Sequence, residues 1–366
     1  MLLRKTVTAR VRRSFGLAAL AMIALAAPFD VAPQSLPIEN IQLRGDRFRG
    51  LHYREMTPEQ RALLYNVVNS ARAVTNTTGN GPFNTLLRSP EVGDLSQQLG
   101  NAIRFSSGLS GRLREIATLM AGRAWTSTYE WYAHARYAAD EGIPAAVIEA
   151  LAALRVPDLH SMPVEDALVW RVADELLYTR RVTDATYQEA FEVLGGRRLL
   201  SSATIAAYYE YVSMLLNVDR YPLPADAPRE AAEAALSLSK PSAAALYRPP
   251  AGPVTRRSAI PNEDTDRAIA ALGASVNRDE ELPRAARDSV RSAVLRQWNR
   301  TAPAADDSVA YRFATELLET REVADATFAT ALDAFGERRL VNLMVLMGHS
   351  NIRCAQWALA GADCVL

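Results

Sequence analysis

Three side chains that can move a proton occur within residues 115–134. Glu115 lies in the segment LREIATLMAGRAW, and Glu130 and His134 lie in the next segment, STYEWYAHARYAADEGIP. On a helix, residues three, four and seven positions apart share one face, so Ser127, Glu130 and His134 point the same way. A carboxylate beside an imidazole can carry out general acid–base catalysis. We therefore predict that Glu115, Glu130 and His134 form a catalytic group.

Each of these residues also has a structural or metal-binding interpretation. His134 could be a core histidine that is hydrogen-bonded to Glu115, and Arg114 could instead pair with that carboxylate. Glu130 could be an ordinary (i, i+4) partner of His134. Two carboxylates and one histidine could also bind a metal ion. Nothing else in the sequence reinforces the metal interpretation, so we predict a site without a metal or cofactor.

Aromatic and polar residues surround this group in the sequence. Tyr129 and Trp131 flank the second carboxylate, and we predict that they and Ser127 contact a substrate. Packing between helices is the alternative for the aromatic residues, and helix capping is the alternative for the serine. Trp125 is better explained by packing, because Trp298 recurs at the aligned position, where no glutamate–histidine helix follows.

The segments that hold these residues have the periodicity and end signals of helices. Thr57-Pro58-Glu59-Gln60 is a capping box that begins a helix through about Val74. Ser89-Pro90-Glu91 begins another helix, and Gly142 and Gly195 lie where C-terminal caps are expected. Further helices are predicted over residues 110–124, 127–141, 144–153, 163–179, 184–194 and 197–217. No period-two alternation competes with this pattern, so we predict an all-α fold.

The chain contains an internal repeat. Residues 99–125 align without gaps with residues 272–298, at an offset of 173. Residues 173–200 align with residues 314–341, at an offset of 141. The two offsets differ by 32 residues, and this deletion removes the counterpart of the glutamate–histidine helix. We predict a pseudo-dimer in which each copy covers the apolar face of the other and only the first copy has an active site.

These residues resemble the carboxymuconolactone decarboxylase-like family. The resemblance rests on GPFNTLLRSPEVGDLSQQLGNAIRFSSGLSGRLREIATLMAGRAWTSTYEWYAHARYAADEGIP and on DELLYTRRVTDATYQ. It covers about residues 55–222, with residues 263–360 as a degenerate second copy, and it implies an alkylhydroperoxidase D-like helical bundle. The peroxidase branch of that fold carries Cys-x-x-Cys-x-x-x-His on its active helix and a glutamate on the preceding helix. Glu115 and His134 match the glutamate and the histidine, whereas Ser127 and Glu130 occupy the two cysteine positions.

The missing cysteines decide which branch of chemistry we predict. Serine and glutamate cannot cycle through a disulfide, whereas the histidine-centred acid–base chemistry of the decarboxylase branch remains available. We predict cofactor-free decarboxylase or lyase chemistry on a small carboxylated or lactone substrate. His134 would donate the proton, Glu115 would fix its tautomer and Glu130 would assist, while Arg114 could hold a substrate carboxylate. A peroxide-detoxifying, peroxiredoxin-type activity and a non-catalytic binding or assembly role remain alternatives.

The N-terminus predicts export. Residues 1–27 contain five basic residues and no acid, and the apolar run Phe15–Ala27 is too short to span a bilayer. Arg12-Arg13-Ser14-Phe15 also resembles a twin-arginine signal. We predict a periplasmic or secreted protein without a stable membrane span after the signal is removed. The formal net charge is zero and no basic stripe follows the N-terminus, so no nucleic-acid partner is expected.

The remaining features concern domain boundaries and cysteines. We predict a signal peptide over 1–27, the repeat with the active helix over 44–235, a Pro-rich linker over 236–261 and the degenerate repeat over 262–366. Cys354 and Cys364 could form a disulfide in an exported protein, but their spacing alone does not fix their distance. A homo-oligomer remains an alternative in addition to the internal pseudo-dimer.

Overall fold

The computed structural model describes residues 38–70, 79–242, 246, 248–257, 263–301 and 306–366. Within these residues the prediction of an all-helical chain is confirmed, and one isolated β-bridge joins Gln42 to His52. Every helix in the described ranges is too short or too polar to span a bilayer. The predicted signal peptide lies outside the described residues.

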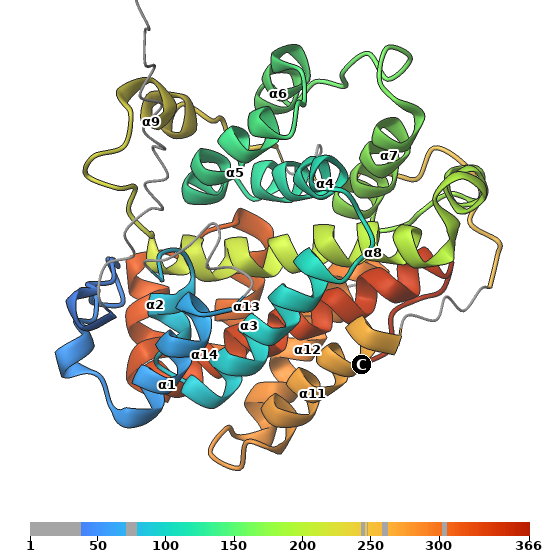
Figure 1. Ribbon diagram of the computed structural model, residues 1–366. Coiled ribbons are helices and arrows are strands. Elements are labelled where there is room, and N and C mark those ends of the chain that lie inside the picture. The colour runs from blue at the N-terminus through green and yellow to red at the C-terminus, as the bar shows by residue number, and fades with distance from the viewer. Residues whose placement is uncertain (1–37, 71–78, 243–245, 247, 258–262, 302–305) are drawn as a thin grey trace, which may run out of the picture. The chain divides into compact units, whose positions relative to one another are not determined.

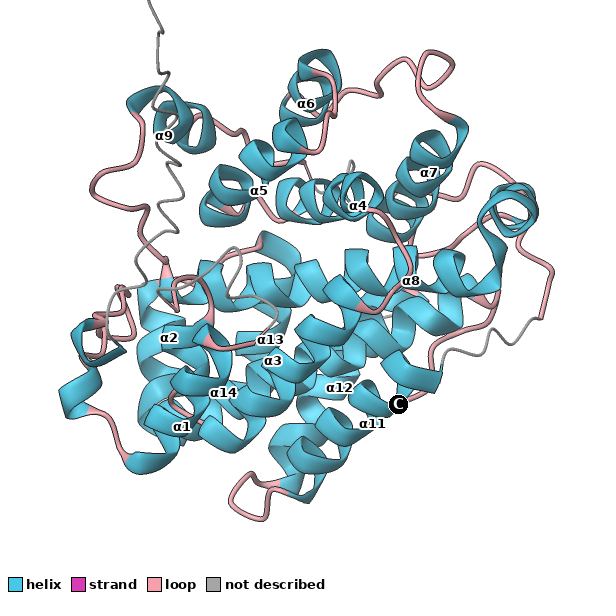
Figure 2. Ribbon diagram, in the orientation of Figure 1, coloured by secondary structure: helices cyan, strands magenta, loops and turns pink. Residues whose placement is uncertain are grey.

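Helices joined by loops make up the fold (Figure 2). Short 3₁₀ turns at Ile38–Asn40 and Tyr53–Glu55 come first. The α-helices are α1 (Pro58–Val68), α2 (Phe83–Leu86), α3 (Pro90–Phe105), α4 (Gly111–Ala124), α5 (Thr128–Asp140), α6 (Ala145–Ala152), α7 (Val164–Thr179), α8 (Asp184–Asp219), α9 (Arg229–Leu236), α11 (Glu263–Arg278), α12 (Arg284–Asn299), α13 (Val309–Thr320) and α14 (Asp325–Leu359).

Local capping bonds explain where several helices begin. Thr57 and Gln60 form the predicted capping box of α1, each side chain bonding to the other residue's backbone N–H. At the start of α8, Thr183 accepts a hydrogen bond from the N–H of Thr186. Such caps satisfy N–H groups that the helix itself leaves without partners.

The prediction for the end of α1 was wrong, because the helix ends at Val68 and not near Val74. Asn69 and Ser70 follow, and both side chains bond to carbonyl oxygens of the last helical turn. Short polar side chains of this kind compete with the helix for its own backbone groups.

The long helix α8 lies at the centre of the described fold. Figure 1 shows α4 to α7 on one side of it and α14 with α11 and α12 on the other. Both α4 and α7 pack against α8, and α14 packs along it. The packed faces are apolar, since Val172 and Leu176 on α7 and Phe313 and Leu317 on α13 are 2% exposed or less. Removal of such side chains from water is the main force that holds helices together.

Both long helices contain a kink at a glycine. Gly195 in α8 has φ 73° and ψ 162°, and Gly336 in α14 has φ 69° and ψ 167°. This backbone region is essentially restricted to glycine. The two positions differ by 141, which is the offset of the sequence alignment. The kink in α8 falls between the two helices that the sequence predicts at 184–194 and 197–217.

A buried polar group joins α8 to α14. Arg180 and Glu210 form an ion pair with side chains 1% and 2% exposed, in which Nη1 lies 2.8 Å from Oε2. The indole of Trp125 donates to Glu210 Oε1 at 2.9 Å, and Asn351 donates to its Oε2 at 2.9 Å. Asn351 in turn accepts a hydrogen bond from the indole of Trp298 at 2.8 Å. The buried carboxylate is thereby paired and hydrogen-bonded, as a charge in a core must be.

Two arginines each contact a tryptophan from the other copy of the sequence repeat. Arg180, at the end of α7, lies 4.7 Å from the ring centroid of Trp298, which belongs to α12. Arg321, at the end of α13, lies 4.4 Å from the ring centroid of Trp125, which caps α4. Both arginines adopt the left-handed backbone conformation, with φ of 58° and 66°. The contact is therefore reciprocal.

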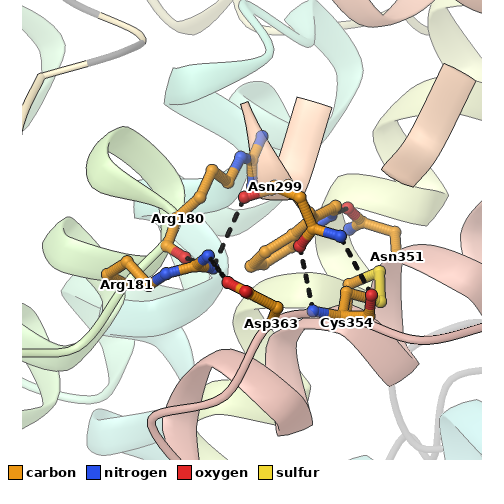
Figure 3. The surroundings of a disulfide bond; sticks show 8 residues. Arg180, Arg181, Asn299, Asn351, Cys354 and Asp363 are labelled. Atoms are coloured by element: carbon orange, nitrogen blue, oxygen red, sulfur yellow. Dashed lines mark hydrogen bonds and ion pairs between the residues drawn. A yellow bond between two sulfur atoms is a disulfide. The ribbon is translucent and has the colours of Figure 1, made fainter. Parts of the chain in front are cut away.

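A disulfide between Cys354 and Cys364 holds the C-terminal residues against α14 (Figure 3). The side chain of Asn299 accepts from the N–H of Cys364 and donates to its carbonyl oxygen, both at 2.9 Å. Arg181, just after α7, forms an ion pair with Asp363 (Figure 3). The last turn of the chain is thus tied to α12 and to the end of α7.

Residues 248–257, the longest described stretch of the predicted linker, are non-helical and bonded to both parts of the chain. The N–H of Arg248 donates to Tyr178 O at 2.8 Å. Arg256 pairs with Asp184 at 2.9 Å and donates to Leu359 O at 2.7 Å.

Candidate active site

Helices α4 and α5 position the predicted catalytic residues. Gly122 on α4 allows α5 to approach closely, because a Cβ at this position would lie 3.1 Å from the Cβ of Glu130. The chain reverses between the helices at Thr126, which has a positive φ of 48°, and Ser127 then begins α5. This tight connection turns one face of α4 toward one face of α5.

The structure brings Glu115, Glu130 and His134 together. Glu115 Oε2 lies 2.5 Å from His134 Nδ1, and the two side chains are 3% and 8% exposed. Glu130 Oε2 lies 3.3 Å from the other ring nitrogen, Nε2, one turn earlier on the same helix. The imidazole therefore stands between two buried carboxylates, one from each helix.

Two residues that the sequence analysis missed complete this buried group. Arg104, on α3, lies 3.4 Å from Glu115 Oε1 and also donates a hydrogen bond to the hydroxyl oxygen of Tyr209, on α8. The ring of Tyr209 meets His134 edge to face, with centroids 5.0 Å apart. The pair of Glu115 and His134 is thus enclosed by four helices, α3, α4, α5 and α8.

Charge determines the protonation of Glu115. Burial raises the pKa of this carboxyl, but the charge and hydrogen bond of His134, and then the charges of Arg104 and Arg114, lower it below its ordinary value of 4.5. Burial lowers the pKa of Arg104, and interactions with Tyr209 and Glu115 outweigh it and raise the pKa above its ordinary value. Glu115 is therefore an ionised carboxylate at neutral pH, and it accepts the hydrogen bond of His134 Nδ1.

A cavity of about 350 Å³ adjoins this group. His134 and Glu130 line it, whereas Glu115 lies behind the imidazole, outside the lining. Arginines and tyrosines supply much of the wall among the described residues: Arg44, Arg104, Arg136, Tyr129, Tyr132, Tyr137, Tyr208 and Tyr209. Aromatic walls with a few charged groups are typical of sites that bind a small, flat, polar molecule.

The predicted substrate-binding residues do not all line this cavity. Tyr129 does. Ser127 is fully buried and lines a neighbouring hollow of about 340 Å³, and its Oγ has no hydrogen-bond partner among the described residues. Trp131 is 4% exposed and belongs to the hydrophobic core. Arg114 donates to Leu109 O at 3.1 Å, beside the start of α4, and also lies outside the lining.

The arrangement is suited to holding and moving a proton. Glu115 accepts from Nδ1 and fixes the ring, so Nε2 is the nitrogen that can exchange a proton with a molecule in the cavity. The two carboxylates approach different nitrogens of His134, which does not favour one metal ion bound by all three. Within the described residues, no group of three or more His, Cys, Asp or Glu side chains is arranged to hold a metal ion.

Comparison with known proteins gives no family assignment. The chain matches no protein-family model and shows no significant match to a curated protein. The chemistry of the site therefore has to be argued from its own geometry.

The repeat alignment contains a signal for the missed residues. Arg104 aligns with Asn277 at the first offset, and Tyr209 aligns with Ser350 at the second. Both differ between the copies, as Glu115 does. A search of the alignment for polar residues replaced in the second copy would have selected them.

Proposed function

We propose that the protein carries out cofactor-free acid–base chemistry, of decarboxylase or lyase type, on a small carboxylated or lactone substrate. One observation carries the proposal: an imidazole that is held at 2.5 Å by a buried carboxylate also lines a cavity of about 350 Å³. A histidine with a purely structural role requires the hydrogen bond but not the cavity. Positioned acid–base groups of this kind accelerate proton transfer by about 10²- to 10⁴-fold.

The residues have defined roles in the proposed reaction. Loss of carbon dioxide breaks a C–C bond, and the electron pair moves onto a neighbouring carbonyl group as an enolate. His134, as the imidazolium with a proton on each ring nitrogen, then donates the Nε2 proton to the carbon, and the ring regains a proton from water with Glu130 beside it. Glu115 stays ionised and keeps the ring oriented. The atoms and electrons balance without an oxidant or reductant.

We also propose that the chain is a tandem carboxymuconolactone decarboxylase-like protein with an alkylhydroperoxidase D-like pseudo-dimer fold. The reciprocal stacking of Arg180 on Trp298 and of Arg321 on Trp125 supports this proposal. The kinks of α8 and α14 at aligned positions support it as well. In this proposal, only the part that contains α5 carries out chemistry.

Periplasmic or secreted localisation is part of the proposal. The Cys354–Cys364 disulfide supports it, because such bonds persist mainly in oxidising compartments. The same bond weighs against a thiol-based peroxidase, since both cysteines are bonded to each other near the C-terminus. Ser127 and Glu130 occupy the positions where a dithiol would be expected.

The test is an activity screen of the chain without residues 1–27 on lactone acids, keto acids and hydrogen peroxide, with carbon dioxide release and peroxide consumption as readouts. We expect decarboxylation that falls by about 10²-fold or more in His134→Gln and in Glu115→Gln. His160→Gln is the matched control, because His160 is exposed outside the cavity. Peroxide consumption that needs Cys354 and not His134 would refute the proposal.

A further inference from the structure

Arg44 stands on the wall of the cavity in a fixed position. Its guanidinium carbon lies 5.7 Å from the ring centroid of Tyr129 and 5.3 Å from that of Tyr221. Its Nε donates to Asn80 Oδ1 at 3.2 Å. The Tyr221 hydroxyl donates to the same oxygen at 3.1 Å and accepts from the N–H of Gly81 at 3.1 Å. Contacts from three separate segments of the chain therefore hold the guanidinium group.

No carboxylate pairs with Arg44 among the described residues. Its hydrogen-bonding neighbours there are Asn80 Oδ1 and the Tyr221 hydroxyl, which leaves other N–H donors of the guanidinium group for a ligand. The other arginine deep in the cavity differs, because Arg104 uses both terminal nitrogens on Tyr209 and Glu115. A guanidinium that is held over aromatic rings and is not paired with a carboxylate is well suited to bind one through the two parallel hydrogen bonds of its planar fork.

The position of Arg44 relative to the catalytic group also matters. Tyr129, which the guanidinium contacts, lies one residue before Glu130 on α5, whereas His134 lies one turn further along that helix. Arg44 and His134 line the same cavity, so a small molecule bound there can contact the guanidinium group and the imidazole together. Holding the guanidinium before the ligand arrives reduces the entropy lost on binding.

We infer that Arg44 binds the carboxylate of the ligand and makes the site selective for small organic acids over neutral molecules of the same shape. The inference deepens the proposed function and rests on it for the reaction, but binding can be measured without turnover. Arg44 thus has the role that the sequence suggested for Arg114, which lies outside the cavity lining.

The test compares two probes that differ only by a carboxylate, γ-butyrolactone and 5-oxotetrahydrofuran-2-carboxylate, by titration calorimetry. We expect the wild-type chain to bind the acid more tightly than the lactone. Arg44→Gln should weaken binding of the acid by about 10- to 100-fold and leave the lactone unchanged. Arg284→Gln is the matched control, because it removes the same charge from a side chain that is 88% exposed and lies outside the cavity. It should change the affinity by less than about 3-fold.

Several outcomes would overturn the inference. These are a wild-type chain with no preference for the acid, equal losses in the two glutamine variants, or an Arg44→Gln variant that still prefers the acid. If Arg44→Gln does not fold, as judged by circular dichroism, Arg44→Lys takes its place, since it keeps the charge but loses the fork. It should lose about 10-fold in affinity for the acid, and an unchanged affinity would equally refute the inference.

The same experiment separates the inference from the proposed function. His134→Gln should keep the preference for the acid, because it leaves Arg44 and its contacts in place. If no substrate is turned over and the preference still depends on Arg44, the proposed function fails and the inference stands. If turnover depends on His134 but its KM is indifferent to Arg44, the inference fails and the proposed function stands.

Discussion

His349, on α14, provides a sharp test of the packing between the long helices and their neighbours. Its ring lies against Gly273 on α11, where a Cβ would come within 2.4 Å of Nε2. Burial, followed by the charges of Arg353 on α14 and Arg291 on α12, lowers the pKa of His349 from 6.5 to about 4. A hydrogen bond with the backbone of Ile269 opposes this shift but is outweighed.

The direction of the pH effect follows from comparing the folded and unfolded chains. In the unfolded chain the histidine titrates near 6.5, so between pH 6.5 and pH 4 the unfolded chain binds a proton that the folded chain does not. Stability therefore falls as the pH falls through this window. At about 1.4 kcal/mol per pH unit the full loss is about 3 kcal/mol, of which about 2 kcal/mol falls between pH 7 and pH 5.

We expect His349→Gln to abolish this loss. Relative to the wild type, the free energy of unfolding of the variant should rise by about 2 kcal/mol on going from pH 7 to pH 5, as measured by urea unfolding followed by circular dichroism. The comparison at each pH cancels the effect of Asp219, whose pKa burial raises to about 6 and which acts in the opposite direction. A variant whose difference from the wild type is the same at both pH values would refute the reasoning.

Two further changes test the packing elsewhere. Cys354→Ser should lower the free energy of unfolding by about 3 kcal/mol, because the disulfide closes a loop between cysteines 10 residues apart. The difference should vanish when both proteins are unfolded in a reducing agent, and a difference that persists would contradict this account. Gly348→Ala should cost about 1–3 kcal/mol, because its Cβ would lie 2.0 Å from the ring of Tyr211 on α8. An unchanged melting curve would show that α8 and α14 do not meet there.

Helix positions could be predicted well because their signals are local. The predicted starts at 110, 127, 144 and 163 each precede the observed start of a helix, α4 to α7, by one residue. Gly195 was expected to end a helix, and in the structure it kinks α8 without ending it. Glycine marks a change of backbone direction from sequence alone, but whether the helix resumes depends on what the next turn packs against.

From the sequence, we could predict only those residues of the site that lie on consecutive helices. Glu115 and His134 lie on consecutive helices with a tight connection, so their spacing was enough to predict that they converge. Arg104, Tyr209 and Arg44 come from α3, α8 and the segment before α1. Whether these residues come together depends on how helices that are distant in the sequence pack against each other. The periodicity of a single helix carries no information about that packing.

A side chain at Gly195 or Gly336 would be unfavourable for a different physical reason than a side chain at Gly348. At Gly195 and Gly336 an added Cβ would meet no other atom within 4 Å, so the cost of a side chain comes entirely from the backbone angles of the residue itself. Crowding at Gly348 can be relieved by a second mutation that shrinks Tyr211. Strain at the kinks has no partner to shrink, so a screen for second-site suppressors should rescue Gly348→Ala and fail to rescue Gly336→Ala.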